Sequence, residues 1–409
     1  MLRVSLIQAR PGMRLAAPVL HPDRPDTMLL RAGFTLDDRA IDRLRSMALP
    51  EIWIEYPDLR FIEKFISPKI TQQRGATQKM LTEIFDRLGS NANAKLDYLT
   101  YRSTVRDFVQ SLINEPEAAL YIQAMSEGDG PLLRHSADVT FLSLLMGLKL
   151  DAYLIAQRRR LAPHRAKDVV ALGVGAMLHD IGLLQIDEEA LQRFYRTNDE
   201  SDAEFRRHVI LGYEQIHGGL DAPAAAAILH HHQHFDGSGF PTRRKSGDEV
   251  RGLAGEEIHI FARILTVADL FDRLRYSDPS AGPVPTVKAL SMMREEPYRD
   301  WVDPVVFKAL LSVVPAYAPG TVVKLSNGES GAVVDWDPAD PCRPTVQRIA
   351  PLEDLGGRGW RSAPCKRFVL SERRDLSIVE VDGVDVSRAN FYPCHDAEFT
   401  LLGTETQAA

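Results

Sequence analysis

The chain has 409 residues, of which 44% are hydrophobic and 26% charged, with a formal net charge of −7. Such a length predicts two or three domains with a buried core, and the negative charge excludes a general attraction to nucleic acid or anionic lipid. Three cysteines near the C-terminus do not suggest a disulfide framework. Because we find no apolar run of roughly 18 residues and no signal-peptide core, we expect a cytoplasmic protein without a membrane span.

The first unit, residues 1–70, reads as a small α+β domain. Residues 3–7 alternate like a strand, residues 16–20 resume an extended pattern, and residues 51–55 read as a further strand. Between them Thr35 fits the N-cap of a helix that runs to about Ala48. We find no catalytic constellation in this unit. A docking or dimerisation platform is preferred here to ligand sensing, and a homodimer is left open.

Residues 71–125 form a predicted helical linker, because apolar residues recur there at helical spacing. The break at 128–131 begins a helical core assigned to residues 126–316. Its predicted helices cover residues 131–150, 166–180, 186–195, 203–217, 222–232, 257–275 and 285–296. The chain is therefore predicted to be mainly α.

After residue 316 the hydrophobic period changes from helical to alternating. Residues 321–325 and 331–335 flank the turn Ser326-Asn327-Gly328-Glu329, which is typical of a β-hairpin. Residues 368–370, 377–381 and 398–402 are candidates for further strands, and the Gly-rich stretch 351–364 is predicted to be a loop. Residues 317–409 are thus assigned to a small β element.

Histidines and aspartates in the core carry the chemistry. The doublet His179-Asp180 ends an apolar helix, and the pair His231-His232 follows some fifty residues later. Imidazole and carboxylate together suit iron, manganese or zinc. A lone histidine such as His135 or His208 is by itself more often a hydrogen-bonded core residue. Its order with the doublet and the pair makes a metal ligand the better interpretation.

In these motifs the chain resembles the HD-GYP proteins, a branch of the HD metal-dependent phosphohydrolases best known for hydrolysing cyclic di-GMP. The resemblance covers about residues 125 to 345. The matching residues, in family order, are the lone His135, the doublet His179-Asp180, the lone His208, the pair His231-His232, the loop Asp236 to Pro241 and the late Asp269. The resemblance implies an HD-type helical bundle.

The resemblance also implies two divalent ions, most simply iron or manganese, that activate water and clamp a phosphate. One ion would take His135, His179, Asp180 and Asp269, and the other Asp180, His208, His231 and His232. Asp180 would bridge them, and Asp180 with His179 forms the predicted catalytic pair. Because adjacent helical side chains point about 100° apart, His231 and His232 share an ion only if the helix end faces the cavity.

Residues for substrate binding are predicted with alternatives open. The candidates are Asp236, Gly237, Gly239, Phe240, Arg273 and Arg275. Asp236 is either a general acid or a turn residue, and the turn is favoured. The two glycines would let the backbone approach a ligand or a partner closely. His230 and His234 would form a competing metal pair at i, i+4, but outer contacts or exposure to solvent are favoured for them.

Departures from the family pattern bear on activity. Leu183 stands where the family carries a lysine, Asp278 where it carries an arginine, Gln233 replaces a glutamate and Phe240 the tyrosine of GYP. Pro131 replaces a glutamate associated with a third metal, so two metals are expected.

We therefore predict a dinuclear phosphodiesterase that converts cyclic di-GMP to pGpG, with GMP left open as a further product. The alternative is a weakly active or inactive regulator that binds cyclic di-GMP or docks on a signalling partner such as a diguanylate cyclase. An HD phosphohydrolase for another nucleotide is a third hypothesis.

Overall fold

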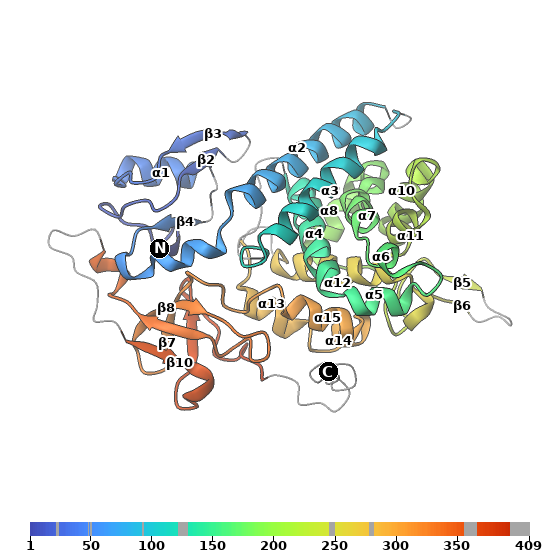
Figure 1. Cartoon of the computed structure of the whole chain (residues 1–409). Coiled ribbons are helices and arrows are strands. Elements are labelled where there is room, and N and C mark those ends of the chain that lie inside the picture. The colour runs from blue at the N-terminus through green and yellow to red at the C-terminus, as the bar shows by residue number, and fades with distance from the viewer. Residues whose placement is uncertain are drawn as a thin grey trace.

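The N-terminal unit consists of two short antiparallel pairs of strands and one helix (Figure 1). The computed structural model describes residues 1–21, 24–47, 49, 51–91, 94–121, 130–244, 250–277, 282–355 and 366–392. β1 (Leu2–Ser5) pairs with β4 (Glu51–Ile54), and β2 (Val19–His21) pairs with β3 (Arg24–Leu30), a strand the sequence did not predict. η1 (Pro57–Phe65) leads out of the unit.

The helix of this unit, α1 (Asp38–Ser46), begins later than predicted. Asp37, not Thr35, is the N-cap, because its carboxylate accepts the backbone N–H of Ala40 at 2.7 Å. A side-chain acceptor placed there satisfies an amide that the first turn leaves unpaired. The expected helix is therefore correct in type and wrong in its first residues.

Two long helices connect this unit to the core. α2 (Pro68–Ser90) starts at the N-cap Ser67, and α3 (Tyr98–Asn114) starts at the N-cap Asp97. Both caps use a side-chain oxygen that accepts an amide of the first turn. α2 packs on α3 and on the first core helix, so the predicted helical linker is part of the main apolar cluster.

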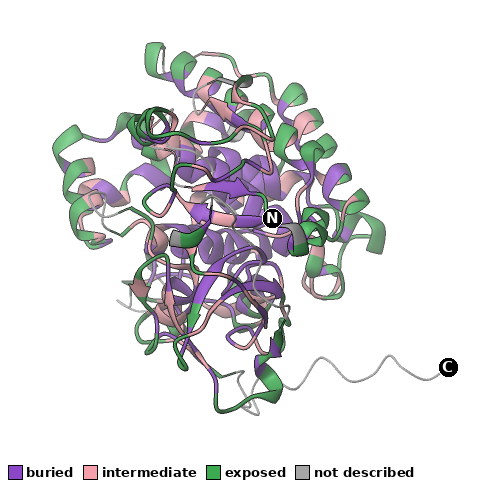
Figure 2. Ribbon diagram, turned by 90° about the vertical axis from the view of Figure 1, so that its left-hand side faces the viewer, coloured by how far each residue is buried: buried purple, intermediate pink, exposed green. Residues whose placement is uncertain are grey.

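The core is a bundle around α4 (Pro131–Lys149), α7 (Val170–Leu178), α11 (Ala222–His230) and α12 (Ile260–Arg275), in which α4 and α11 each contact α7 and α12. These four helices are largely buried, and Figure 2 shows the buried segments gathered in the interior of the molecule. Its helices are α4 (Pro131–Lys149), α5 (Asp151–Gln157), α6 (Pro163–Ala166), α7 (Val170–Leu178), α8 (Glu188–Thr197), α9 (Ala203–Arg206), α10 (His208–Ile216), α11 (Ala222–His230), α12 (Ile260–Arg275), α13 (Thr286–Met292), α14 (Tyr298–Trp301) and α15 (Pro304–Leu311). Short 3₁₀ segments are η2 (Ile181–Gln185), η3 (His217–Gly219) and η4 (Gly255–Glu257). The mainly α prediction is confirmed.

Two predicted helices differ in their limits. The stretch 203–217 is divided at Arg207, where α9 ends and α10 begins. The helix predicted for 222–232 ends at His230, so that His231 is its C-cap and His232 lies beyond it. α15 was not predicted, although Asp303 caps it by accepting the amides of Val305 and Val306.

The C-terminal part forms a six-stranded sheet in the order β10-β9-β8-β7-β11-β12 with antiparallel neighbours. Its strands are β7 (Val322–Leu325), β8 (Ser330–Asp335), β9 (Thr345–Arg348), β10 (Arg367–Val369), β11 (Ile378–Val381) and β12 (Val384–Asp385), with η5 (Leu352–Asp354) and η6 (Leu370–Glu372) between them. The predicted hairpin is confirmed by the pairing of Val323 with Gly331. The strand predicted at 398–402 lies outside the described residues.

Both faces of this sheet are buried. Alternate side chains belong to different clusters: Val323 and Val333 join the core of the helical bundle, whereas Val322 and Ala332 join the N-terminal unit. In addition, the amide of Arg3 donates to the carbonyl of Gly320 at 2.8 Å. The N-terminal unit therefore lies against the C-terminal sheet, as the blue and orange segments of Figure 1 show. The predicted division into four parts stays a prediction.

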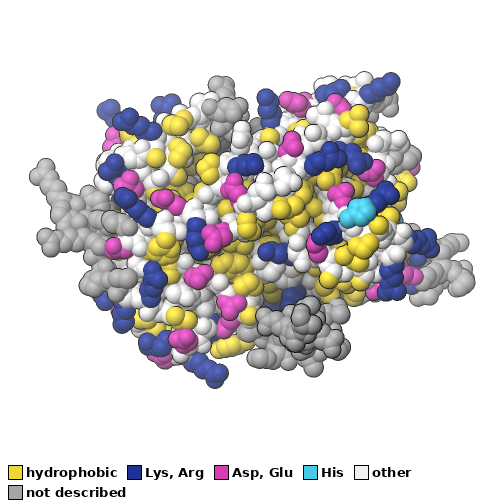
Figure 3. All heavy atoms as spheres, viewed as in Figure 1, with side chains coloured by type: hydrophobic (Ala, Val, Ile, Leu, Met, Phe, Trp, Pro, Cys, Tyr) yellow, Lys and Arg dark blue, Asp and Glu magenta, His cyan; other side chains and the backbone are white. Residues whose placement is uncertain are grey.

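One helical stretch, Pro163–Gln185, is long and apolar enough to cross a membrane, but 78% of its most apolar window is buried inside the fold. A bent pair, Pro131–Lys149 with Asp151–Gln157, passes the same test together. A buried core helix has the same composition, so this is weak support for a span. On the face seen in Figure 3, basic and acidic side chains are dispersed among hydrophobic ones. The cytoplasmic location stays a prediction.

Candidate metal centre

Seven buried side chains converge at one end of the bundle from α4, α7, α10, α11 and α12. They form two groups of potential metal ligands: His135, His179 and Asp269, and Asp180, His208, His231 and His232. Within each group the candidate ligand atoms all lie within 4.8 Å of one another. These are the seven residues that the sequence predicted as ligands, and the fold brings all of them together.

Asp180 stands between the two groups, with one carboxylate oxygen facing each. Oδ2 lies 3.5 Å from Nε2 of His135 and 3.3 Å from Nε2 of His179. Oδ1 lies 3.5 Å from Nε2 of both His208 and His231. We call His135, His179, Asp269 and Asp180 Oδ2 the first half-site, and His208, His231, His232 and Asp180 Oδ1 the second half-site.

The spacings inside the half-sites fit the coordination shell of a cation. His135 Nε2 lies 3.3 Å from His179 Nε2 and 3.1 Å from Asp269 Oδ1, and His208 Nε2 lies 3.3 Å from His231 Nε2. Around an ion with ligand distances of about 2.1 Å, neighbouring ligands at 90–110° lie about 3.0–3.4 Å apart. The donor set therefore fits a divalent ion in each half-site.

Three of the histidines are oriented by backbone carbonyl groups. His179, His208 and His231 each place Nδ1 against the carbonyl oxygen three residues earlier, at 2.8, 2.6 and 2.7 Å. A neutral ring that donates from Nδ1 has a lone pair and no proton on Nε2. In the second half-site two such lone pairs face each other across 3.3 Å, which is unfavourable unless a cation lies between them.

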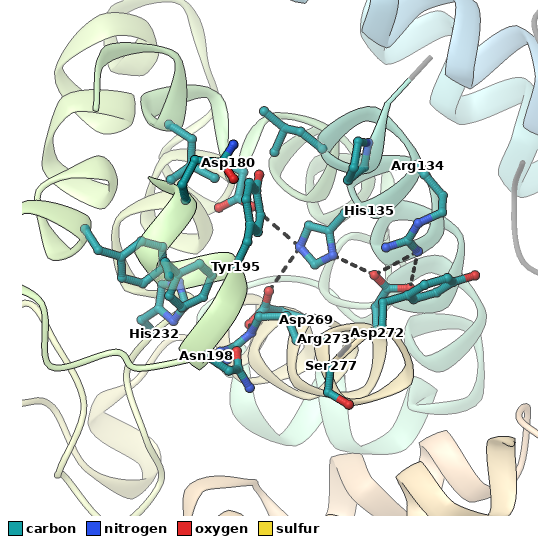
Figure 4. A pocket seen from close by; sticks show the side chains of 17 residues that line it. Arg134, His135, Asp180, Tyr195, Asn198, His232, Asp269, Asp272, Arg273 and Ser277 are labelled. Atoms are coloured by element: carbon teal, nitrogen blue, oxygen red, sulfur yellow. Dashed lines mark hydrogen bonds and ion pairs between the residues drawn. The ribbon is translucent and has the colours of Figure 1, made fainter. Parts of the chain in front are cut away.

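His135 is oriented by a carboxylate instead. Its Nδ1 lies 2.7 Å from Asp272 Oδ2, and Asp272 in turn accepts from the Arg134 guanidinium at 2.9 Å. Figure 4 shows the His135 ring between Asp269 on one side and Asp272 on the other. His135, Asp272 and Arg134 are all buried. The His135 ring therefore cannot turn without breaking its contact with Asp272.

His232, which follows the end of α11, has a third kind of support. Its Nδ1 lies 3.4 Å from Glu200 Oε1, and its ring stacks on Phe240 with centroids 4.7 Å apart. Because the helix ends at His230, the chain turns there, and adjacent histidines reach the same half-site. The end of the helix thus faces the cavity, which is the condition under which His231 and His232 can bind the same ion.

The pKa values of the histidines differ between the half-sites. Burial, assisted by the neighbouring His232, lowers the pKa of His208 and lowers that of His231 to about 4, so both rings are neutral at pH 7 and able to bind a metal. Burial also opposes the charged form of His135. Hydrogen bonds to Asp269 and Asp272 outweigh this effect and raise the pKa of His135 to about 10. An ion in the first half-site would therefore displace a proton.

A cavity of about 320 Å³ opens onto the two half-sites. This volume is at the lower end of the range for ligand pockets. Its wall includes aromatic and neutral polar side chains, among them Tyr195, Asn198 and Gln192, and two arginines, Arg134 and Arg273 (Figure 4). Leu183 also lines it, so the position where the family carries lysine faces the cavity.

The predicted substrate-binding residues divide into two sets. Arg273 lines the cavity, but it pairs with Asp269 at 2.8 Å and with Glu200 at 2.5 Å. Arg275 does not line it, and its guanidinium donates to the Val284 carbonyl and the Thr286 hydroxyl.

The residues of the loop also lie outside the cavity wall. Asp236 accepts the amide and hydroxyl of Ser238, which makes it a turn residue. Gly239 allows a close approach to the chain itself, because a Cβ there would lie 2.3 Å from the carbonyl oxygen of His232. Gly237 adopts a positive φ of 87°. Phe240 is buried beneath His232.

Three further positions that the sequence analysis singled out are His234, Gln233 and Asp278. His234 is buried, with Nδ1 2.9 Å from the Ser238 hydroxyl and its ring stacked on Trp301. Gln233 bridges the loop, donating to the Pro241 carbonyl and accepting the Leu253 amide. Asp278 lies outside the described residues.

The supporting residues Asp272, Arg134 and Glu200 were missed by sequence reasoning. Asp272 lies one helical turn after Asp269, a spacing that places both on the same face of α12 and was available as a signal. Glu200 lies in the acidic turn between α8 and α9, which reads as a solvated segment. Nothing in the sequence distinguishes it.

Comparisons with known proteins agree with this geometry. The sequence model of the HD domain family matches residues 152–306. The cyclic di-GMP phosphodiesterase PA4108 of Pseudomonas aeruginosa is 25% identical over 75% of this chain and 75% of its own length. The cyclic di-GMP phosphodiesterase response regulator RpfG of Xanthomonas campestris is 33% identical over 28% of each chain.

Residues 152–306 are thus an HD domain, in a chain whose motifs resemble those of the HD-GYP proteins. A 3′3′-cGAMP-specific phosphodiesterase of Vibrio cholerae is 33% identical over 35% of this chain and 29% of its own length. A solved HDG"Y"P protein of Bdellovibrio bacteriovorus, Bd1817, covers 76% of this chain and 97% of its own, with a TM-score of 0.44 and 16% identity.

Proposed function

We propose that this protein is a metal-dependent phosphodiesterase that hydrolyses a cyclic dinucleotide, with cyclic di-GMP as the first candidate, pGpG as the product and GMP left open as a further product. The observation that carries the proposal is the position of Asp180, whose two oxygens each face one group of histidines. A carboxylate so placed is suited to bridge two ions. The names of the relatives support the reaction and the substrate class.

Two divalent ions, iron or manganese in our proposal, would supply the positive charge that polarises a phosphodiester and makes water nucleophilic at neutral pH. The seven residues of the half-sites would hold these ions, and Asp180 and His179 would be the catalytic pair. Mixed imidazole and carboxylate donors are compatible with both metals. A phosphodiester in the cavity would lie directly against them.

Neutral groups of the wall would orient the substrate. Burial raises the pKa of the Tyr195 phenol, which therefore keeps its proton and can donate a hydrogen bond to a phosphate or sugar oxygen. The Asn198 amide oxygen accepts from Arg273 at 3.1 Å, which fixes the orientation of that amide. Phe194 and Tyr195 add an apolar wall that excludes water.

A second candidate is a regulator that holds metals and binds cyclic di-GMP with little turnover. It is favoured by the state of the two arginines in the wall, because Arg134 pairs with Asp272 and Asp138, and Arg273 with Asp269 and Glu200. Their charge is already balanced by carboxylates, and Leu183 adds none. A signalling partner such as a diguanylate cyclase, and a homodimer, remain predictions.

The deciding experiment is anaerobic purification followed by elemental analysis and by turnover assays with iron or manganese. Separate assays would use cyclic di-GMP and 3′3′-cGAMP. Two metals per chain with hydrolysis of either substrate would support the enzyme. Two metals with tight binding but no product would favour the regulator, and one metal or none would contradict both.

A further inference from the structure

Glu200 is a buried carboxylate outside every motif, and it contacts three groups of the metal centre. Its Oε1 lies 3.4 Å from Nδ1 of His232 and 2.5 Å from Nη2 of Arg273, and its Oε2 lies 3.2 Å from Nε2 of His234. Only 8% of Glu200 is exposed. A buried charge costs several kcal/mol unless it is paired, so this carboxylate stays only because these partners compensate it.

The surroundings hold Glu200 in this place. The carbonyl oxygen of Glu200 accepts from Nε of Arg206 at 2.6 Å, and the Arg206 guanidinium lies over the ring of Phe240, 5.0 Å from its centroid. Phe240 stacks on His232. The ring of His232 is therefore held on one face by Phe240 and at Nδ1 by Glu200.

We propose that Glu200 is a positioning residue that orients His232 for the second ion. Arg273, another partner of Glu200, pairs separately with Asp269 of the first half-site at 2.8 Å, a contact that does not involve Glu200. This role rests on the proposed function, because it supposes two bound ions. Outer partners of metal-binding histidines fix the orientation and the tautomer of the ring.

The Glu200→Gln substitution tests this role with little change in shape. A carboxylate offers two acceptor oxygens to His232, His234 and Arg273, whereas an amide offers one acceptor and two donors. The negative charge that faces these three groups is therefore lost, and a single amide oxygen remains to accept from them. Loss of an outer partner typically weakens metal binding about 10–100-fold, and the proposal assigns this loss to the second ion alone.

The measurement is a titration of the metal-free full-length protein with Mn²⁺, followed by electron paramagnetic resonance. A single bound ion gives a mononuclear signal, and two adjacent ions give an exchange-coupled one. In Glu200→Gln the first ion should bind as in the parent protein. The coupled signal should require about 10–100 times more Mn²⁺ and should return at high Mn²⁺, which a misfolded site would not allow.

Glu204→Gln is the matched control. Glu204 lies one turn further along the chain, and its carboxylate pairs with Arg207 on the surface, at 2.8 Å. This variant should titrate like the parent protein. Equal binding of both ions by Glu200→Gln and the parent would overturn the role of Glu200, as would an equal loss for both ions. A parent protein that never gives the coupled signal would instead remove the two-ion function itself, and this role with it.

Discussion

The two half-sites share Asp180 but differ in their other ligands. In the first half-site two carboxylates, Asp269 and Asp180, accompany two imidazoles, and His135 is backed by Asp272 at 2.7 Å. In the second half-site three imidazoles accompany one carboxylate oxygen. Each half-site has one ring backed by a carboxylate, His135 by Asp272 and His232 by Glu200, and its other rings are backed by uncharged backbone carbonyls. The half-sites therefore differ in the ligands themselves, because the first has two carboxylates and the second has one.

Because of this difference, we expect the two half-sites to bind their ions with different affinities. Oxygen ligands favour hard ions such as Mn²⁺, and the first half-site has two carboxylates where the second has one. We therefore expect the first half-site to fill first, and the second to depend more on the positioning of its rings.

The largest effect is expected where the two half-sites meet. Asp180→Asn removes the charge shared by both and leaves an amide in its place. Turnover and metal affinity should fall by more than the roughly 100-fold that loss of an outer partner costs at most, and the metal content of the purified variant should be lower. Elemental analysis and a hydrolysis assay check this. Wild-type turnover in the variant would remove the bridging role.

Asp272, the outer carboxylate of the first half-site, allows the experiment that corresponds to Glu200→Gln in the second. Asp272→Asn removes the negative charge behind His135, and we expect the first Mn²⁺ to bind about 10–100-fold more weakly. Competition with a chelator of known affinity measures it. If Asp272→Asn and Glu200→Gln weaken the same ion, the two half-sites are not distinct.

The cavity wall should change substrate affinity without affecting either half-site. Leu183→Lys places a cation where the wall has no uncompensated positive side chain among its described residues. Binding of cyclic di-GMP should tighten very roughly ten-fold, or about 1.4 kcal/mol, and the gain should shrink at high salt.

The control for this change is Leu183→Met, which keeps the volume and adds no charge. Metal content should be unaltered in both variants. Unchanged affinity in Leu183→Lys would mean that the phosphates lie elsewhere or that cyclic di-GMP is the wrong ligand. Adding Asp278→Arg should increase the gain if that residue also faces the phosphates.

The smallest effect is expected on the pH dependence of the metal-free protein. The pKa of His231 is lowered to about 4 in the fold, so stability should fall as the pH drops from 6.5 towards 4, where the unfolded chain binds the additional proton. The pKa of His135 is raised to about 10, so its contribution is complete below pH 6.5 and is lost as the pH rises towards 10.

Thermal unfolding in the presence of a chelator measures both limbs of this profile. His231→Gln should flatten the acid limb, and His135→Gln the alkaline limb. The opposite assignment would mean that the surroundings of the two histidines have been misjudged.

Residues that belong to a sequence motif could be predicted, whereas residues that act only through tertiary contacts could not. The seven candidate ligands lie on or next to largely buried, apolar helices in a recognisable order, and the structure groups them as the motif implied. Glu200 could not be found, because it reaches His232 from a turn without a motif or a period. Arg273 was assigned to the substrate because the sequence shows its charge but not its two carboxylate partners.

Some features of the fold could likewise be predicted from the sequence, and others could not. Helices with long apolar stripes were predicted in type, whereas helix ends such as Asp37 depend on a single hydrogen bond that several neighbouring residues could make. The hairpin at 321–335 was evident from its turn. That both faces of the sheet are buried was not evident, because each strand is too short to show which neighbour its alternate residues meet.

That sheet makes the ends of the chain mutually dependent. A helical core expressed without residues 317–409 would expose the apolar surface that now meets Val323 and Val333, and an N-terminal unit expressed alone would expose the surface that meets Val322 and Ala332. Neither piece is a self-sufficient module. Transfer of the N-terminal unit to another enzyme would succeed only if residues 317–409 were transferred with it, so the two ends of the sequence act as one structural part.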